Sequence, residues 1–324
     1  MLNPFARAAR SSISRRLAIV LSVALLASCG GDGFDEAKTP PLFSTVVVFG
    51  ASLTDTGNCG SPSAGACPPS PPYAAGRASN GALFVETIAG RYGAAVAPSS
   101  RGGTNFAYGG ARTGNIRGLT TQSTIPSMVA QLDRFITSPV AASALNPQTL
   151  FVIDASTFGN NFNAAASAGL LVDQAAVQTL VVDAITDVVT IMTRLYNAGA
   201  RNMLVINAPN LGLTPLVRAQ GAAAQAGAQA ASGGFAQNLL PAIQANLTPT
   251  TAPGLRVYLL DLFTLSNAIT ANPAAAGLTN VVDACVTTTV CATPDSYLYW
   301  DPFHPTRAAG AYIAAQAATL LPAP

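Results

Sequence analysis

The chain has 324 residues, of which 50% are hydrophobic and only 9% charged, and its formal net charge at pH 7 is +2. A nucleic-acid-binding protein usually presents a basic face, and 16 basic against 14 acidic residues give no sign of one. The chain has one histidine and no Cys-x-x-Cys pair, so a metal site is not expected either.

The first 28 residues have the pattern of an export signal. Four arginines precede an apolar run from 17 to 27, which is too short to span a bilayer as a mature helix. The run leads into Leu-Ala-Ser-Cys at 26–29, which is typical of a lipobox, so Cys29 is expected to carry a lipid. Plain secretion with Cys29 left unmodified is the alternative. Without residues 1–28 the charge balance becomes 16 − 4 = 12 basic against 14 acidic residues, a net charge of about −2.

The polar segment from 30 to 41 is predicted to tether the protein to the membrane. No linker divides the rest, so residues 42–324 are expected to form one domain. We therefore predict an exported, monomeric protein that is lipid-anchored in the bacterial cell envelope, at the outer membrane or in the periplasm, or else secreted.

The first strand-like run ends at a candidate nucleophile. Residues 45–49 are strand-favouring, Gly50 follows, and Ser52 stands where the strand becomes a loop. A serine on a sharp turn at the carboxyl end of a strand projects its Oγ above the sheet edge, close to backbone N–H groups that can meet an oxyanion. An ordinary turn serine would look the same in isolation, so this assignment depends on the rest of the chain.

Besides Cys29 the chain has four cysteines, Cys59, Cys67, Cys285 and Cys291. Four cysteines allow three pairings, among them the local one that joins the first two and the last two. The local pairing closes two short loops, each stabilising the fold by about 2 kcal/mol in the chain-entropy account. Disulfides agree with an oxidising compartment.

Strand-like runs recur at 45–49, 149–153, 203–207 and 255–260, with helical patterns between them. Apolar strands that alternate with helices imply an α/β fold with a parallel sheet covered on both faces. In such a sheet ligands bind at the carboxyl ends of the strands, which is where Ser52 lies.

The longest helical pattern runs from 172 to 198 and is followed by Gly199, a typical helix stop. Shorter helices are predicted at 82–92 and 307–320. The Ala, Gln and Gly-rich run at 219–234 permits a helix but has few apolar anchors, so a solvent-facing helix is expected, with a mobile flap as the alternative. The long helix should bury a stripe at spacings of three and four. The stripe consists of Val177, Leu180, Val181, Ala184, Ile185, Val188, Ile191, Met192 and Leu195.

His304, the one histidine, stands between Pro302 and Pro305 and three residues after Asp301. A Ser-His-Asp hydrolase needs an imidazole to accept the serine proton and a carboxylate to hold the ring. The i, i+3 spacing would put Asp301 and His304 on one face of a helical turn. These residues predict a catalytic triad of Ser52, His304 and Asp301.

Three stretches together resemble the SGNH (GDSL-type) hydrolases. Residues 50–58, Gly-Ala-Ser-Leu-Thr-Asp-Thr-Gly-Asn, are similar to the family's G-D-S-L-x-D-x-G-N, with Ala51 where the family usually has Asp. Residues 103–111, Gly-Thr-Asn-Phe-Ala-Tyr-Gly-Gly-Ala, resemble its second block, and residues 301–306, Asp-Pro-Phe-His-Pro-Thr, its last. The resemblance implies a three-layer α/β/α sandwich with a mainly parallel sheet of about five strands, similar to flavodoxin.

Two other segments are similar to the family in part. Residues 73–81 match Y-x-x-G-R-x-S-N-G. The Pro, Gly and Ser-rich loop at 59–72 that continues into them either shapes a substrate mouth or only covers the site. The block after the strand at 149–153 is irregular, because residues 154–162 are about two residues longer than the family's G-x-N-D.

The resemblance also implies an oxyanion hole. It would consist of the N–H groups of Ser52 and Gly110 and the side-chain amide of Asn160, with Asn161 as the alternative donor. An amide suits this role because it donates a hydrogen bond to a developing negative charge without carrying a positive charge of its own. No metal or organic cofactor is implied.

We therefore predict ester hydrolysis through an acyl-enzyme on Ser52. The family covers bacterial lipases and esterases, phospholipases and lecithinase-like lipoproteins, and a carboxylesterase or lipase-like activity on short to medium acyl esters is favoured. Two enzymatic alternatives are a phospholipase and an acetyl esterase or acyltransferase on envelope polysaccharide. A non-catalytic binding lipoprotein is a third, which Ala51 and the irregular third block favour.

Overall fold

The computed structural model describes residues 42–62, 64–119 and 124–324. The predicted signal peptide, Cys29 and the tether lie outside the described residues.

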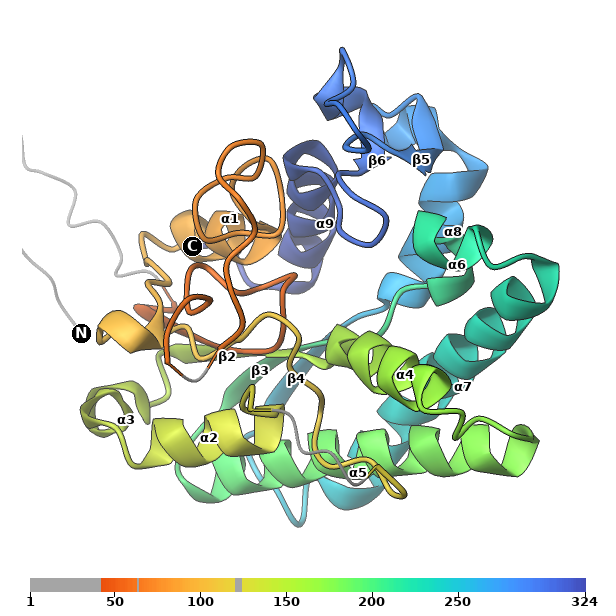
Figure 1. Cartoon of the computed structure of the whole chain (residues 1–324). Helices are drawn as coiled ribbons and strands as arrows, with labels where there is room; N and C mark the ends of the chain where they lie inside the picture. The colour runs from red at the N-terminus through yellow and green to blue at the C-terminus, as the bar shows by residue number, and fades with distance from the viewer. Residues whose placement is uncertain (1–41, 63, 120–123) are drawn as a thin grey trace, which may run out of the picture. The chain divides into compact units, whose positions relative to one another are not determined.

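A parallel sheet of four strands, in the order β1-β2-β3-β4, forms the centre of the fold (Figure 1). Neighbouring strands pair without a bulge, so that Val47 lies opposite Phe151 and Phe151 opposite Met203. All four predicted strands are confirmed to within one residue at each end. The strands are β1 (Thr45–Phe49), β2 (Thr149–Asp154), β3 (Asn202–Ile206) and β4 (Arg256–Leu260).

The free edge of β1 carries a short extended segment in place of a regular fifth strand. The N–H of Val48 donates to the Thr104 carbonyl at 3.1 Å, and the N–H of Phe106 donates to the Val48 carbonyl at 2.8 Å. The expected sheet of about five strands is thus four strands plus this bridged segment. A separate small parallel sheet, β5 (Asn280–Ala284) with β6 (Tyr297–Tyr299), leads into the loop that carries His304.

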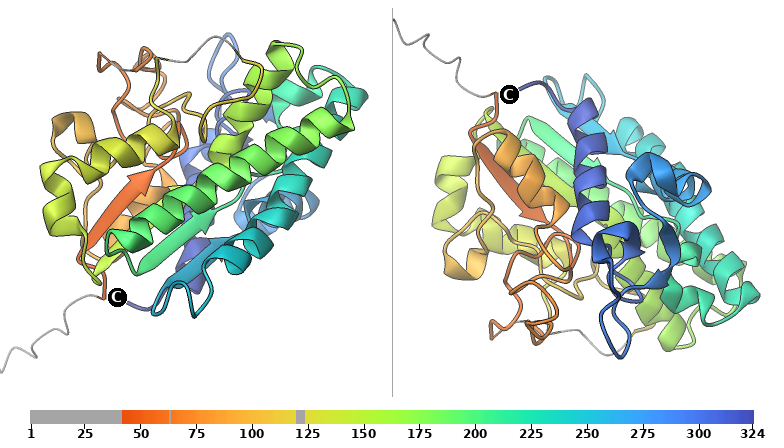
Figure 2. Two further views of the ribbon diagram at one scale, coloured as in Figure 1. Left: turned by 90° about the horizontal axis from the view of Figure 1, so that it is seen from below. Right: turned by 90° about the horizontal axis from the view of Figure 1, so that it is seen from above.

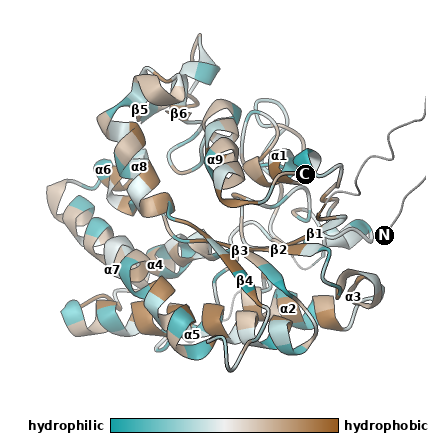
Figure 3. Ribbon diagram, turned by 180° about the vertical axis from the view of Figure 1, so that it is seen from behind, coloured by the Kyte–Doolittle hydropathy of each residue, from teal (hydrophilic) through white to brown (hydrophobic). Residues whose placement is uncertain are grey.

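Alternate residues of the strands face two hydrophobic cores, which is why the strands are mostly apolar, with polar residues such as Asn202 and Arg256 at their ends (Figure 3). Val47 and Phe49 belong to the core under α2, α5 and α7, whereas Val46 and Val48 belong to the core under α1 and α9. Figure 2 shows the two helical layers from opposite sides. The helices are α1 (Phe84–Arg91), α2 (Met128–Ile136), α3 (Pro139–Ala144), α4 (Phe158–Ser167), α5 (Gln174–Asn197), α6 (Pro215–Arg218), α7 (Ala222–Asn246), α8 (Leu262–Ala271) and α9 (Arg307–Leu320).

Helix α5 buries the predicted stripe: eight of its nine residues are buried, and Val177 packs half-buried against the same core. The helix ends before Gly199, whose φ of +117° only glycine adopts readily. Among the described residues α5 is also the one helix that length and composition would allow to cross a membrane. Its buried stripe makes it the core helix of this fold.

Helix α7 corrects the expectation of a solvent-facing helix at 219–234. Ala228, Ala231 and Gly233 are buried, and a Cβ on Gly233 would lie 3.1 Å from the Phe263 ring. Small side chains allow close approach, so the helix packs into the core without the bulky apolar anchors that the sequence pattern lacks. Further along α7, Phe235 stacks on Phe158 with ring centroids 4.5 Å apart.

Phe135 on α2 provides a test of this packing. Its fully buried ring makes edge contacts with Phe49, Phe106 and Phe151 at centroid distances of 5.6, 5.4 and 5.8 Å. We expect Phe135→Ala to lower the free energy of unfolding by about 3–5 kcal/mol, measured by urea denaturation. The neighbouring Ile136, 36% exposed, is the control, and Ile136→Ala should cost about 1 kcal/mol or less. Equal losses in the two variants would contradict this account.

Candidate active site

Ser52 lies in the turn that follows β1, and the turn is held by buried polar contacts. Gln131 on α2 accepts the Gly50 N–H through Oε1 and donates to the Gly50 carbonyl through Nε2, both at 2.9 Å. A Cβ at Gly50 would collide with Thr54 and with Asp154. Only glycine therefore lets Thr54 and Asp154 pack this closely against the backbone before the serine.

The structure brings the three predicted triad residues together. Nε2 of His304 lies 2.8 Å from Oγ of Ser52, and Nδ1 lies 2.7 Å from Oδ2 of Asp301. The other Asp301 oxygen accepts the backbone N–H groups of Phe303 and His304 at 2.8 and 2.7 Å. Asp301 and His304 are thus neighbours as predicted, but in a side-chain-capped loop turn and not in the expected helical turn.

The carboxylate of Asp301 stays ionised in this setting. Burial alone would raise its pKa, but the hydrogen bond and charge of His304, with the backbone N–H groups, outweigh burial and lower the pKa. An ionised carboxylate can accept a hydrogen bond from Nδ1–H of His304, which leaves Nε2 unprotonated as the acceptor for a serine hydroxyl.

The backbone N–H groups of Ser52 and Gly110 have no acceptor among the described residues. Gly110 has a φ of +79°, in the left-handed region, whereas the preceding Gly109 N–H is engaged by the Asp55 carboxylate at 2.9 Å. Asn160 donates through Nδ2 to the Ala111 carbonyl at 2.7 Å, which leaves its second amide hydrogen free for the cavity.

The two candidate asparagines of the irregular third block have different surroundings. The extra residues of this block form a 3-10 turn at Ala155–Thr157, capped by Asp154, before α4 begins. Asn160 on the first turn of α4 then lines the cavity. Asn161 is 1% exposed and exchanges two hydrogen bonds with Thr113, at 2.7 and 2.9 Å.

Two residues of the first block have positions that sequence reasoning missed. The buried Asp55 carboxylate accepts the N–H groups of Asn58 and Gly109 at 2.7 and 2.9 Å. The buried Asn58 amide donates to the carbonyls of Asn105 and Ala107, both at 2.8 Å. Burial raises the pKa of Asp55, and the opposing effect of its backbone hydrogen bonds is too small to cancel this rise. These contacts hold the serine turn against the segment that carries Gly110. Asp55 and Asn58 are the first and last residues of the D-x-G-N part of the motif, from which their importance could have been inferred.

A cavity of about 330 Å³ opens beside the serine and the histidine. The loop closed by the Cys59–Cys67 disulfide forms part of its wall, and the second disulfide joins Cys285 to Cys291, so the local pairing is confirmed. The cavity is lined by Ser52, Asp55, Cys59, Gly65, Ala66, Pro68, Gly76, Ala78, Gly109, Gly110, Asn160, Asn163, Leu216, Phe303 and His304.

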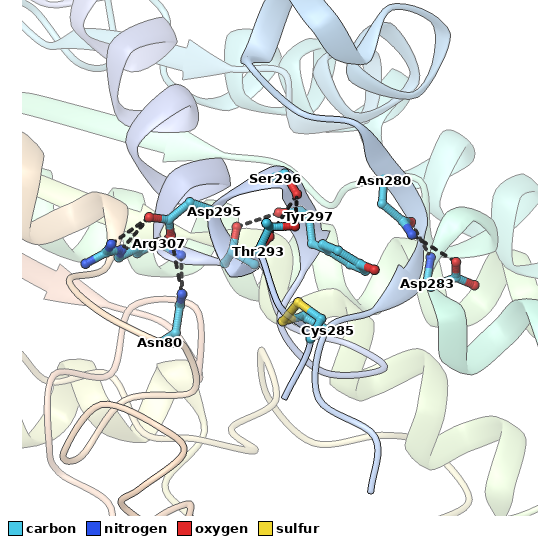
Figure 4. Close-up of a disulfide and its surroundings, with 11 residues drawn as sticks. Asn80, Asn280, Asp283, Cys285, Thr293, Asp295, Ser296, Tyr297 and Arg307 are labelled. Atoms are coloured by element: carbon cyan, nitrogen blue, oxygen red, sulfur yellow. Dashed lines mark hydrogen bonds and ion pairs between the residues drawn. A yellow bond between two sulfur atoms is a disulfide. The ribbon is translucent and has the colours of Figure 1, made fainter. Parts of the chain in front are cut away.

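The segment at 73–81 holds the loop of His304 as well as lining the cavity. Ser79 Oγ donates to the Pro305 carbonyl at 2.9 Å, and the Arg307 N–H donates to Asn80 Oδ1 at 2.7 Å. Figure 4 shows Asn80 beside the ion pair of Arg307 and Asp295, near the Cys285 disulfide.

Comparison with known proteins gives one family. The profile of the family described as GDSL-like Lipase/Acylhydrolase matches residues 46–317. A phosphatidylcholine-sterol acyltransferase of Aeromonas hydrophila is 31% identical over 57% of this chain, and the match spans half of the acyltransferase's length. A GDSL esterase/lipase of Arabidopsis thaliana is 28% identical over 84% of this chain and 88% of its own. A solved extracellular lipase from Streptomyces rimosus shares 14% identity, covering 86% of this chain and 99% of its own, with a TM-score of 0.38.

Asp187 on α5 anchors the loop next to the cavity and should make stability depend on pH. It accepts a hydrogen bond from Thr113 Oγ1 at 2.7 Å. Its pKa is raised to about 6, mainly by burial. The hydrogen bond from Thr113 opposes this shift, and the negative charge of Asp183 adds to it. The folded protein then holds a proton that the unfolded chain releases near pH 3.8, so this group reduces stability as pH rises from about 4 to 6.

The substitution Asp187→Asn should remove this loss of stability with rising pH, because the amide does not titrate. We expect the free energy of unfolding of the variant, relative to the parent protein, to be higher at pH 7 than at pH 4 in urea titrations. Asp295→Asn is the control, because Arg307 lowers the pKa of Asp295 and the same gain should not occur. If the free energy of unfolding of Asp187→Asn, relative to the parent protein, were the same at pH 4 and at pH 7, the role given to this carboxyl would be refuted.

Proposed function

Because the chain belongs to the GDSL-like lipase/acylhydrolase family and is a hydrolase acting on ester bonds, we propose that it is a carboxylesterase or lipase-like enzyme for short to medium acyl esters. The observation that supports this most is the pair of hydrogen bonds that connects Ser52 through the His304 ring to Asp301, beside a cavity that Ser52 and His304 line.

In the first step Ser52 Oγ attacks the ester carbonyl carbon. His304 Nε2, 2.8 Å away, takes the hydroxyl proton as the new C–O bond forms. The imidazolium is stabilised by Asp301, which also keeps the ring in the tautomer that leaves Nε2 unprotonated before attack. His304 then passes the proton to the leaving alcohol, and the acyl group remains on Ser52.

The carbonyl oxygen becomes an oxyanion during this attack. The N–H groups of Ser52 and Gly110 and the second amide hydrogen of Asn160 would stabilise its charge. Since neither backbone N–H has an acceptor among the described residues, no existing hydrogen bond has to break when the oxyanion forms. Water activated by His304 then attacks the acyl-enzyme and releases the acid.

The size of the cavity supports the proposal of short to medium acyl groups. Its volume of about 330 Å³ is at the lower end of the range of ligand pockets, about 300–1,000 Å³. Glycine and alanine form part of its wall, at Gly65, Ala66, Gly76 and Ala78. Longer chains would extend past the open mouth into solvent.

We also propose that the enzyme works in the cell envelope, tethered through a lipid on Cys29. Its two disulfides support an oxidising compartment. Anchoring through Cys29, a monomeric state and a single domain over 42–324 are parts of this proposal that follow from the sequence pattern.

A phospholipase or acyltransferase activity is the second candidate, and the similarity to the acyltransferase of Aeromonas hydrophila favours it. The acyl-enzyme on Ser52 could pass its acyl group to an alcohol in place of water. Family membership argues against a purely non-catalytic lipoprotein.

A p-nitrophenyl ester series from acetyl to palmitoyl tests the proposal on residues 30–324. We expect hydrolysis, fastest for the shorter chains, and a loss of about 10⁴- to 10⁶-fold in kcat for Ser52→Ala and for His304→Ala. Circular dichroism confirms that the variants fold. A fluorophosphonate probe should label the parent protein and not Ser52→Ala.

An inactive, unlabelled parent protein would refute the proposed mechanism. Release of fatty acid from phosphatidylcholine vesicles, or transfer of its acyl chain to added cholesterol, with little p-nitrophenyl ester turnover would favour the second candidate.

The two asparagines of the third block give a sharper test of the oxyanion hole. Asn160→Ala should lower kcat by about 10²- to 10³-fold with little change in the melting temperature, because its amide faces the cavity. Asn161→Ala should instead lower the melting temperature, since it removes both of the buried hydrogen bonds between Asn161 and Thr113. The opposite pattern would assign the oxyanion donor to Asn161.

A further inference from the structure

The Asp301 carboxylate has a donor that the triad does not account for. The Tyr73 hydroxyl donates to Oδ2 at 2.8 Å, and this is the same oxygen that accepts Nδ1–H of His304 at 2.7 Å. Tyr73 lies 228 residues before Asp301 in the chain. Its half-buried ring meets the edge of Trp300, with centroids 6.0 Å apart and planes at 88°.

We propose that Tyr73 is a positioning residue of this site, whose hydroxyl fixes the Asp301 carboxylate and limits the negative charge that it presents to His304. The inference rests on the proposed triad mechanism, because it concerns how the acid of that triad acts on its base.

The hydroxyl can act only as a donor here. Asp301 is ionised and has no proton to give. Burial, the hydrogen bond to Asp301 and its negative charge together raise the pKa of Tyr73 well above its usual value, so the phenol keeps its proton at every working pH.

All four hydrogen bonds to Asp301 fix the plane of its carboxylate. Oδ1 accepts two backbone N–H groups, from Phe303 and His304, and Oδ2 accepts His304 Nδ1 and the Tyr73 hydroxyl. Among the described residues, Tyr73 is the one of these donors that comes from outside the loop of residues 300–305. The nearby bonds from Ser79 to Pro305 and from Arg307 to Asn80 hold the same two segments together but do not reach the carboxylate.

Charged groups on the surrounding elements are engaged elsewhere. Asp55 across the cavity binds backbone N–H groups, and Arg77 pairs with Glu86. Among the described residues, His304 and Tyr73 are the titratable side chains that hydrogen-bond to Asp301. On the neighbouring helices, Arg218 on α6 donates to the Leu213 carbonyl and Arg307 on α9 pairs with Asp295.

Tyr73→Phe removes the hydroxyl and keeps the ring against Trp300. With one donor fewer, Asp301 stabilises the imidazolium more strongly, so His304 should hold its proton to higher pH. We expect the kcat/KM of the parent protein to rise with pH along an acidic limb, as His304 loses its proton and becomes a free base. In the variant this acidic limb should move up by about 0.5–1 pH unit, less than the about 1–3 units of a full neighbouring charge.

Since His304 is the one histidine, its imidazole NMR signals report the same shift without any catalysis. Tyr92→Phe is the matched control: its hydroxyl also donates to an oxygen, the Pro322 carbonyl at 2.7 Å, but Tyr92 lies on the face of the sheet covered by α1. Its pH profile and imidazole titration should overlay those of the parent protein.

The two readouts keep the outcomes apart. An imidazole titration and an acidic limb that both stay within about 0.2 pH unit of the parent, in a folded Tyr73→Phe variant, would overturn the role of Tyr73. A shifted imidazole titration in a protein that hydrolyses no ester would support the Tyr73 contact and overturn the proposed function.

Discussion

The hydrogen bond between His304 and Ser52 is the contact on which the rest of the site depends. It joins two residues 252 positions apart, one at the carboxyl end of β1 and the other in the loop after β6. A distance of 2.8 Å between two side chains on loops is maintained only if both loops are held from several sides. Most of the polar contacts around the cavity have this effect.

The serine loop is held by buried polar groups in place of regular strand pairing. Gln131 binds both backbone groups of Gly50, and Asn58 binds two carbonyls of the segment at 105–107. Each of these amides is fully buried, so their hydrogen bonds cannot be replaced by water, and losing one partner would leave the other unsatisfied. The free edge of β1 thereby positions Gly110 close to Ser52 with little regular β structure.

The histidine loop is held by a different part of the chain, the segment between Cys59 and Gly81. This segment forms the disulfide-closed wall of the cavity and also contacts the loop at Asp301, Pro305 and Arg307. One stretch therefore lines the cavity and also holds the loop of Asp301 and His304. A change in this wall should affect specificity and rate together.

The sequence by itself determined the α/β class, the four main strands and the α5 stripe, and it predicted the three side chains that the structure brings within hydrogen-bond distance, Ser52, His304 and Asp301. These features follow from local periodicity and from motifs whose spacing is read directly along the chain. The extra residues of the lengthened third block form a 3-10 turn before Asn160. The choice between Asn160 and Asn161 could not be made in this way, since neighbouring residues on a helix differ only in which way they face.

Only the tertiary structure decided the contacts between distant segments. Helix α7 has few large apolar residues, and its burial depends on close approach by partners such as Phe263 that no local pattern reveals. The turn at 301–304 is loop and not helix because the Asp301 side chain takes the place of a backbone acceptor. The contact of Tyr73 with Asp301 likewise exists only because folding brings together residues 228 positions apart, and hydrogen bonds of that kind leave no periodic trace in a sequence.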